Sequence, residues 1–145
     1  MRILLVAVAT FIAVEAAHAV LAEENYSVAP VLKSFTTITG QTIQYPAGKP
    51  EISSVLIELP PGKESGRHTH PVPTYVHILT GTLTVEFDDG VRQTFDAGQG
   101  FLEAVNTWHN GKNPGQTPVT FLVIFAGEQG KPNMIRPDKM NERVR

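Results

Sequence analysis

The chain has 145 residues, with 12 basic and 14 acidic side chains, a formal net charge of −2 and no cysteine. Its scattered and nearly balanced charges argue against nucleic-acid binding. The lack of cysteine excludes thiolate metal sites, redox-active pairs and cysteine nucleophiles. The length is sufficient for one domain that its hydrophobic core stabilises without disulfides.

The first residues have the layout of a secretory signal peptide. Arg2 gives a short positive start, residues 3–14 are almost entirely apolar, and residues 17–19 read Ala-His-Ala, a small-residue cleavage site. The apolar run is too short to span a bilayer comfortably. We therefore expect residues 1–19 to be removed and the mature protein to be secreted or periplasmic, with no membrane attachment. An uncleaved N-terminal anchor is the alternative.

Export has a direct test. Protein expressed with its own leader is expected to begin at Val20, or at Glu23 if cleavage uses the second small-residue site at residues 20–22. Mass spectrometry of the exported protein measures this start. Exported protein that retains Met1 would contradict the prediction.

From residue 30 onward the pattern favours β-strands. Stretches rich in β-branched and aromatic residues alternate with Gly, Pro and Asp turn signals, and residues 110–118 read as a turn-rich loop. The expected strands lie at residues 52–59, 75–79, 82–87, 91–95, 101–105 and 119–126. The last is a nearly continuous apolar run, typical of a central buried strand. This pattern predicts an all-β antiparallel sandwich or barrel over residues 30–127, followed by a C-terminal arm at residues 128–145.

Three of the five histidines have a spacing that suits one metal ion. His68 and His70 are one residue apart, so an extended strand places both side chains on the same face. His109 has to arrive from a second strand, whereas His77 is expected to pack rather than to ligate. Three imidazoles bind first-row transition metals and leave coordination positions open, as a catalytic site requires. The alternative is that these are ordinary surface or loop histidines.

The first of these segments resembles a signature motif of the cupin superfamily. That motif reads G-x5-H-x-H-x3,4-E-x6-G, and Gly62, His68, His70 and Gly81 match it in register. Thr74 stands where the motif has its glutamate. That glutamate is usually the fourth protein ligand in the family, so the resemblance implies a shell of three histidines here.

The second segment resembles the other cupin motif, G-x5-P-x-G-x2-H-x3-N. Gly98, His109 and Asn113 match in register, while Ala104 replaces the proline and Asn106 replaces the glycine. The resemblance covers most of the chain after the leader and implies a jelly-roll barrel, the double-stranded β-helix of cupins. Small single-domain cupins similar to this chain are often grouped as quercetin-dioxygenase-like proteins.

Other residues near the expected mouth of the barrel are candidates for the chemistry. Glu103, six residues before His109, would restore a carboxylate to the site or move a proton, and a rim or salt-bridge role is its alternative. Tyr75 is a second candidate for proton transfer. Arg67 is a candidate for binding an anionic substrate at the mouth, with an ordinary exposed arginine as the alternative. Trp108 is a candidate for substrate recognition, and packing is the alternative for both Trp108 and Tyr75.

The resemblance and the histidines together favour an exported cupin that binds a divalent transition metal, with Fe, Mn, Zn, Ni and Cu all suitable. It would act on a small organic molecule, with oxygen-dependent oxidation as the leading reaction class. One alternative is a non-enzymatic module for a small, sugar-like ligand. Another is a metal-dependent isomerase or lyase in which Glu103 or Tyr75 moves a proton. Small cupins commonly pair through sheet edges, so we also expect a homodimer, with residues 30–45 as a contributor.

Overall fold

The computed structural model describes residues 27–137, so the predicted leader and residues 138–145 of the predicted arm lie outside the described residues. The described part of the chain contains no helix that is long and apolar enough to cross a membrane. Seven strands are found within it: β1 (Pro50–Leu59), β2 (Thr74–Thr80), β3 (Thr82–Phe87), β4 (Arg92–Asp96), β5 (Gly100–Leu102), β6 (His109–Lys112) and β7 (Val119–Glu128).

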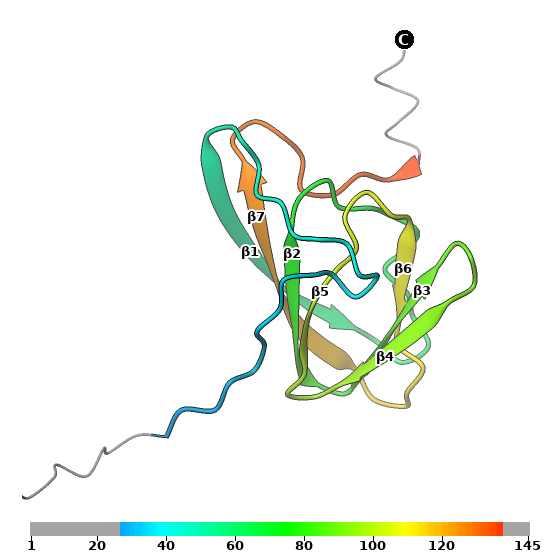
Figure 1. The fold of residues 1–145 in the computed structure, drawn as a ribbon. Coiled ribbons are helices and arrows are strands. Elements are labelled where there is room, and N and C mark those ends of the chain that lie inside the picture. Colours follow the sequence, from blue (N-terminus) through cyan, green and yellow to red (C-terminus); the bar gives the residue numbers. More distant parts are fainter. Residues whose placement is uncertain (1–26, 138–145) are drawn as a thin grey trace, which may run out of the picture.

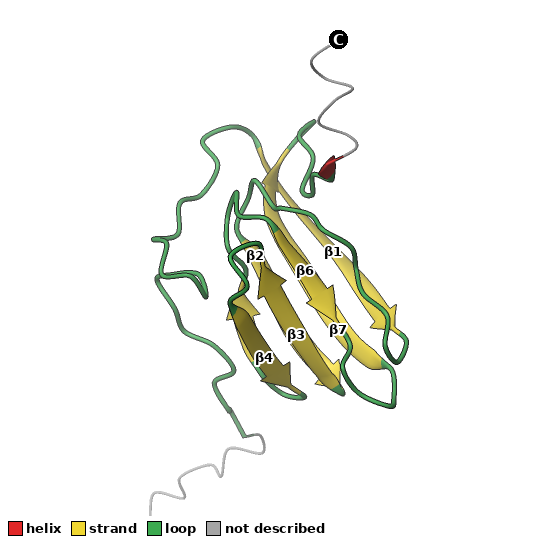
Figure 2. Ribbon diagram, turned by 90° about the vertical axis from the view of Figure 1, so that its right-hand side faces the viewer, coloured by secondary structure: helices red, strands yellow, loops and turns green. Residues whose placement is uncertain are grey.

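The strands form two antiparallel sheets that lie face to face as a barrel (Figures 1 and 2). One sheet has the strand order β1-β7-β2-β5 and the other β4-β3-β6, and every pairing between strands is antiparallel. The predicted all-β antiparallel barrel is therefore confirmed. All six expected strands are present: β3 has the expected bounds, the other five are shifted at one or both ends, and β5 is the shortest of them.

The expected central strand is β7, which pairs with β1 on one side and with β2 on the other. Its burial alternates strictly, because a strand turns successive side chains to opposite faces. Val119, Phe121, Val123 and Phe125 point into the barrel and are at most 9% exposed. They pack with inward residues of β2 and β3 in one hydrophobic core, part of which lines the candidate site.

Strand β6 is the element that the sequence did not predict. Its residues read His-Asn-Gly-Lys, without the β-branched or aromatic side chains that favour strands. It is nevertheless paired along its length with β3, from Thr84 opposite Lys112 to Phe87 opposite His109. Backbone pairing with a neighbouring strand, rather than local preference, places His109 in the barrel.

After β7 the chain crosses one end of the barrel, a segment drawn in orange in Figure 1. We call residues 131–137 the C-terminal strap. Its Ile135 exchanges two backbone hydrogen bonds with Thr69, at N–O distances of 2.9 and 3.0 Å. These bonds hold the strap against the segment that carries His68 and His70.

Candidate metal centre

The three histidines of the two motifs meet inside the barrel. His68 and His70 lie on the extended segment before β2, and His109 opens β6, where it pairs with His68. One ring nitrogen from each residue lies within 4.8 Å of the corresponding nitrogens of the other two. All three side chains are buried, with exposures of 7%, 3% and 1% in chain order. The structure therefore brings the three predicted histidines together.

Each imidazole is oriented by a backbone carbonyl that accepts a hydrogen bond from its Nδ1. The Nδ1–oxygen distances are 2.6 Å from His68 to Gly66, 2.8 Å from His70 to Asn133, and 2.9 Å from His109 to Thr107. A carbonyl oxygen can only accept, so each Nδ1 carries a hydrogen. Each neutral ring therefore presents its Nε2 lone pair for binding. Metal-ligating histidines are usually held in the same way, with the other ring nitrogen donating a hydrogen bond.

Glu103 brings a carboxylate to the same place. It follows β5, is 8% exposed, and points one oxygen at each of two histidines. Its Oε2 lies 2.8 Å from Nε2 of His70, and its Oε1 lies 3.6 Å from Nε2 of His109. The structure thus places this predicted residue among the histidines, in addition to giving it salt-bridge contacts.

Glu103 is also a direct neighbour of Thr74, the residue at the motif's glutamate position. The backbone N–H of Glu103 donates to the carbonyl of Thr74 at 2.9 Å. Thr74 is fully buried, and its hydroxyl donates to the backbone carbonyl of Val72 at 3.1 Å, which occupies its one proton. The carboxylate therefore comes from the adjacent segment of the barrel instead of from position 74.

The electrostatics of the group follow from burial and from the single carboxylate. Burial lowers the pKa of His68 to about 4, despite the hydrogen bond to the Gly66 carbonyl. Burial works against the ionised form of Glu103, but the facing imidazoles of His109 and His70 outweigh it and hold the pKa of that carboxyl well below its usual range. Burial also opposes the charged form of His109, yet the Glu103 carboxylate raises its pKa. The site therefore combines a neutral imidazole with an ionised carboxylate.

Within the described residues, some nitrogen and oxygen acceptors of this site have no hydrogen-bond donor, and a bound cation would satisfy them. Nε2 of His109 is buried and has no hydrogen-bond partner. Nε2 of His70 and the oxygen of Glu103 are two acceptors only 2.8 Å apart when the ring is neutral, so a positive charge is needed between them. Three imidazole nitrogens and one carboxylate form a donor set that suits a first-row divalent metal. The residues present thus fit such an ion.

A cavity of about 140 Å³ adjoins the site inside the barrel. Its walls are mostly apolar side chains of β7 and neighbouring strands, including Phe121, Val123 and Phe125. The polar groups in its lining are the ligand candidates His68, His70 and Glu103, together with Ser65 and the strap residue Arg136. Its small volume and mostly apolar walls suit a small, partly apolar molecule.

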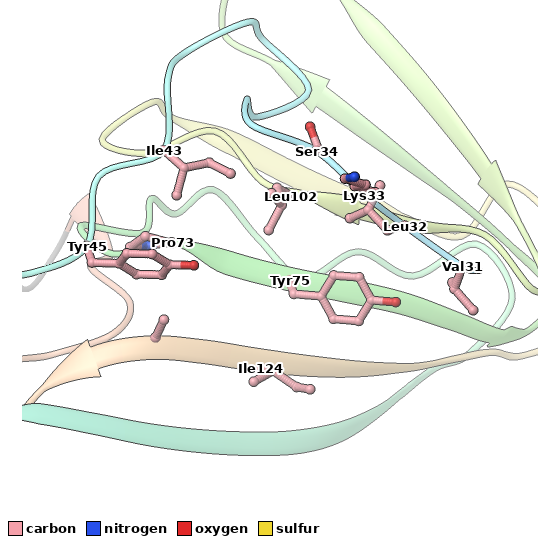
Figure 3. A pocket seen from close by; sticks show the side chains of 11 residues that line it. Val31, Leu32, Lys33, Ser34, Ile43, Tyr45, Pro73, Tyr75, Leu102 and Ile124 are labelled. Carbon is pink, nitrogen blue, oxygen red and sulfur yellow. The ribbon is translucent and has the colours of Figure 1, made fainter. Parts of the chain in front are cut away.

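Tyr75 is not part of this group, which corrects the expectation that it lies at the mouth of the barrel. Thr74 and Val76 of β2 are buried and point into the barrel. Because successive residues of a strand face opposite sides, Tyr75 and His77 point to the outer face. There Tyr75 lines a separate pocket together with residues of the N-terminal segment (Figure 3). Its ring stacks with that of His77 at 6.3 Å between centroids.

Arg67 and Trp108 form a separate contact on the outside of the barrel. The guanidinium lies 4.3 Å from the centre of the indole ring and donates to both oxygens of Asp88, at 3.0 Å from Nε to Oδ1. The positive charge of Arg67 is therefore already paired, which weakens the predicted role in binding an anionic substrate. Asn113 bonds the backbone carbonyls of Leu59 and Thr117, both at 2.8 Å, so it supports a loop.

Sequence reasoning missed the contribution of the C-terminal strap. Asn133 orients His70, and Met134 and Arg136 line the cavity. No periodicity or motif marks these residues, because their place depends on backbone pairing with Thr69. Only the structure connects this polar segment with the site.

Comparison with known proteins identifies the family. A family model described as "Cupin domain" matches residues 55–125, which include both histidine segments. The chain carries a cupin domain. Cupins commonly bind divalent metals, and the three buried histidines can form such a site. The narrower quercetin-dioxygenase-like group stays a prediction, and no curated protein sequence matches the chain.

Solved structures share the cupin fold at low sequence identity. An oxalate decarboxylase from Lactobacillus farciminis, in complex with formate, has a TM-score of 0.53 at 24% identity over 63% of this chain and 28% of its own. A double-stranded β-helix protein from Klebsiella pneumoniae has a TM-score of 0.51 at 18% identity, over 64% and 88%. A DMSP lyase from Ruegeria pomeroyi has a TM-score of 0.51 at 16% identity, over 59% and 43%. The cupin chain thus spans less than half of either enzyme.

Proposed function

We propose that this cupin is an exported, metal-dependent enzyme that acts on a small organic molecule, with oxygen-dependent oxidation as its reaction class. One observation carries the proposal. Three imidazoles converge with the Nδ1 of each ring held by a backbone carbonyl, and the Glu103 carboxylate faces two of them, beside a small and mostly apolar cavity. A purely structural metal site is normally closed by its protein ligands, whereas this one faces space for a ligand.

The residues of the site would have different roles. His68, His70 and His109 would hold the metal, and Glu103 would complete the shell from the position next to Thr74. When bound, the metal would polarise a substrate and, if redox-active, exchange electrons with it. The apolar walls would exclude water from the reacting molecule. Glu103 is also the one carboxylate among the described residues that line the cavity, so it is the candidate to accept a proton from a substrate.

Metal loading combined with oxygen uptake tests this function. Protein stripped with a chelator is reloaded separately with Fe(II), Mn(II), Cu(II) and Zn(II), and oxygen consumption is followed with a panel of small organic acids, alcohols and phenols. We expect uptake with at least one redox-active metal and none with Zn(II). Turnover without oxygen in the Zn(II) form would instead indicate an isomerase or lyase, and failure to take up any metal would indicate a binding module.

We further propose that the protein is a homodimer that forms along strand β1. This strand is at the edge of the larger sheet, and Ile52 and Leu56 on its outer face are 70% and 66% exposed. An exposed edge that carries large aliphatic side chains favours pairing with another chain. A second copy would bury both, together with the neighbouring N-terminal segment, whose Val31 and Tyr45 are also exposed.

Light scattering at micromolar concentration is expected to give about twice the mass of the mature chain. The variant Leu56→Glu should shift the protein to the monomer, because a carboxylate at this place would be buried without a partner in the dimer. Leu79→Glu is the matched control, since Leu79 is 44% exposed on β2, away from the β1 edge. A monomeric wild type, or equal effects of the two variants, would contradict the proposal.

A further inference from the structure

One basic residue lines the candidate cavity, and it comes from the C-terminal strap. Arg136 shares the cavity lining with His68, His70 and Glu103. Its Nη1 donates to the backbone carbonyl of Ser65 at 3.0 Å, next to the start of the histidine segment. The backbone pairing of the preceding Ile135 with Thr69 fixes the strap there.

The guanidinium lies against the backbone at Gly66, whose conformation favours glycine. A Cβ on Gly66 would lie 3.0 Å from Nη1 of Arg136, and Gly66 has a φ of +79°, which other residues rarely adopt. The same Gly66 offers its carbonyl to Nδ1 of His68. This one turn therefore positions both a metal-ligand candidate and the arginine.

The charge of Arg136 is not neutralised by the described part of the chain. Within residues 27–137 the ion pairs involve other basic residues, and Arg136 has no carboxylate within 4.0 Å. Its recorded partner is a neutral carbonyl, which takes one of five N–H donors. Arg67 is the opposite case, since Asp88 already accepts from it on the outside of the barrel. The Glu103 carboxylate faces His70 and His109 instead, at 2.8 and 3.6 Å.

We propose that Arg136 makes this site selective for small molecules that carry a carboxylate. The guanidinium fork would receive the carboxylate in a two-point contact, which suits the planar geometry of both groups. The apolar wall formed by Phe121 and Val123 would contact the remainder of the molecule. The inference rests on the proposed function only for the statement that the bound molecule is the substrate, and carboxylate binding itself needs no metal.

Binding of short carboxylates to the metal-free protein tests the inference. The probes are the acids from acetate to hexanoate and the corresponding neutral amides, measured by calorimetry or by NMR titration. We expect each carboxylate to bind about 10- to 100-fold more tightly than its amide, the advantage of charge-assisted over neutral hydrogen bonds. Arg136→Met, which keeps the length of the side chain, should abolish this preference, and Arg136→Lys should retain only part of it.

Arg67→Met is the matched control, because it removes the same charge outside the cavity and should leave the preference unchanged. Circular dichroism and thermal unfolding of all variants verify that the strap is still in place. An unchanged preference in Arg136→Met would overturn the inference, as would no preference in the wild type. If the wild type is selective but takes up no metal, the proposed function fails while the carboxylate site stands. If it binds metal but not carboxylates, the carboxylate site fails while the proposed function stands.

Discussion

Alanine at His68, His70 or His109 is expected to remove most of the bound metal, which is the largest effect predicted for this protein. Each substitution deletes one of three converging imidazole nitrogens. Loss of an outer contact of a metal ligand typically costs about 10- to 100-fold in affinity, so loss of the ligand itself should cost at least about 100-fold. Metal content after dialysis, measured by elemental analysis of the protein beside its wild type, gives the result.

The fold should survive these substitutions. The hydrophobic core is made of strand residues such as Val76, Val85 and Phe121, which do not depend on the metal. Each variant leaves a backbone carbonyl without its imidazole donor, a loss of about 1–3 kcal/mol in the free energy of unfolding when the group is buried. Circular dichroism should therefore show the wild-type strand content in all three variants.

His77→Ala is the control for this series. His77 lies on the outer face of β2 beside Tyr75. The metal content of the His77→Ala variant should therefore equal that of the wild type. Equal metal in the wild type and in His70→Ala would refute the site. Loss of metal in His77→Ala with retention in His109→Ala would mean that the wrong third histidine had been chosen.

The sequence predicted the barrel because its strands carry the local signals of strands. Strands β2, β3 and β7 are rich in β-branched and aromatic residues, and turn residues separate the strands along the chain. The grouping of His68 and His70 follows from the two-residue period of a strand. His109 was placed by resemblance to the second motif, since its strand β6 has no strand-like composition and exists through pairing with β3.

What the sequence did not predict depends on contacts between distant segments. The strap reaches the site through the pairing of Ile135 with Thr69, and nothing near residue 135 indicates such a partner. The error for Tyr75 has a different origin. Its neighbour Thr74 is the motif position, and a strand turns adjacent residues to opposite faces, so Tyr75 had to point outward once Thr74 pointed inward.

The second large effect concerns Glu103, which we expect to act as the carboxylate ligand that Thr74 cannot supply. Glu103→Gln keeps the shape of the side chain but removes the charge that faces His70 and His109. Metal affinity should fall by about 10- to 100-fold, since an anionic oxygen is replaced by a weak neutral one. Competition with a chelator of known affinity measures the change in each metal form.

Exchanging residues 74 and 103 tests whether Glu103 binds the metal directly or only contributes a negative charge nearby. In the double variant Thr74→Glu and Glu103→Thr the carboxylate moves to the motif position, on a backbone that is hydrogen-bonded to residue 103. Because Thr74 is fully buried and faces inward, the moved carboxylate should reach the same centre and recover most of the affinity lost in Glu103→Gln. The single variant Thr74→Glu should unfold at lower temperature without metal, because two carboxylates would then be buried together. If Glu103→Gln binds metal as tightly as the wild type, Glu103 serves only as a salt-bridge partner of the histidines, and the shell consists of three imidazoles.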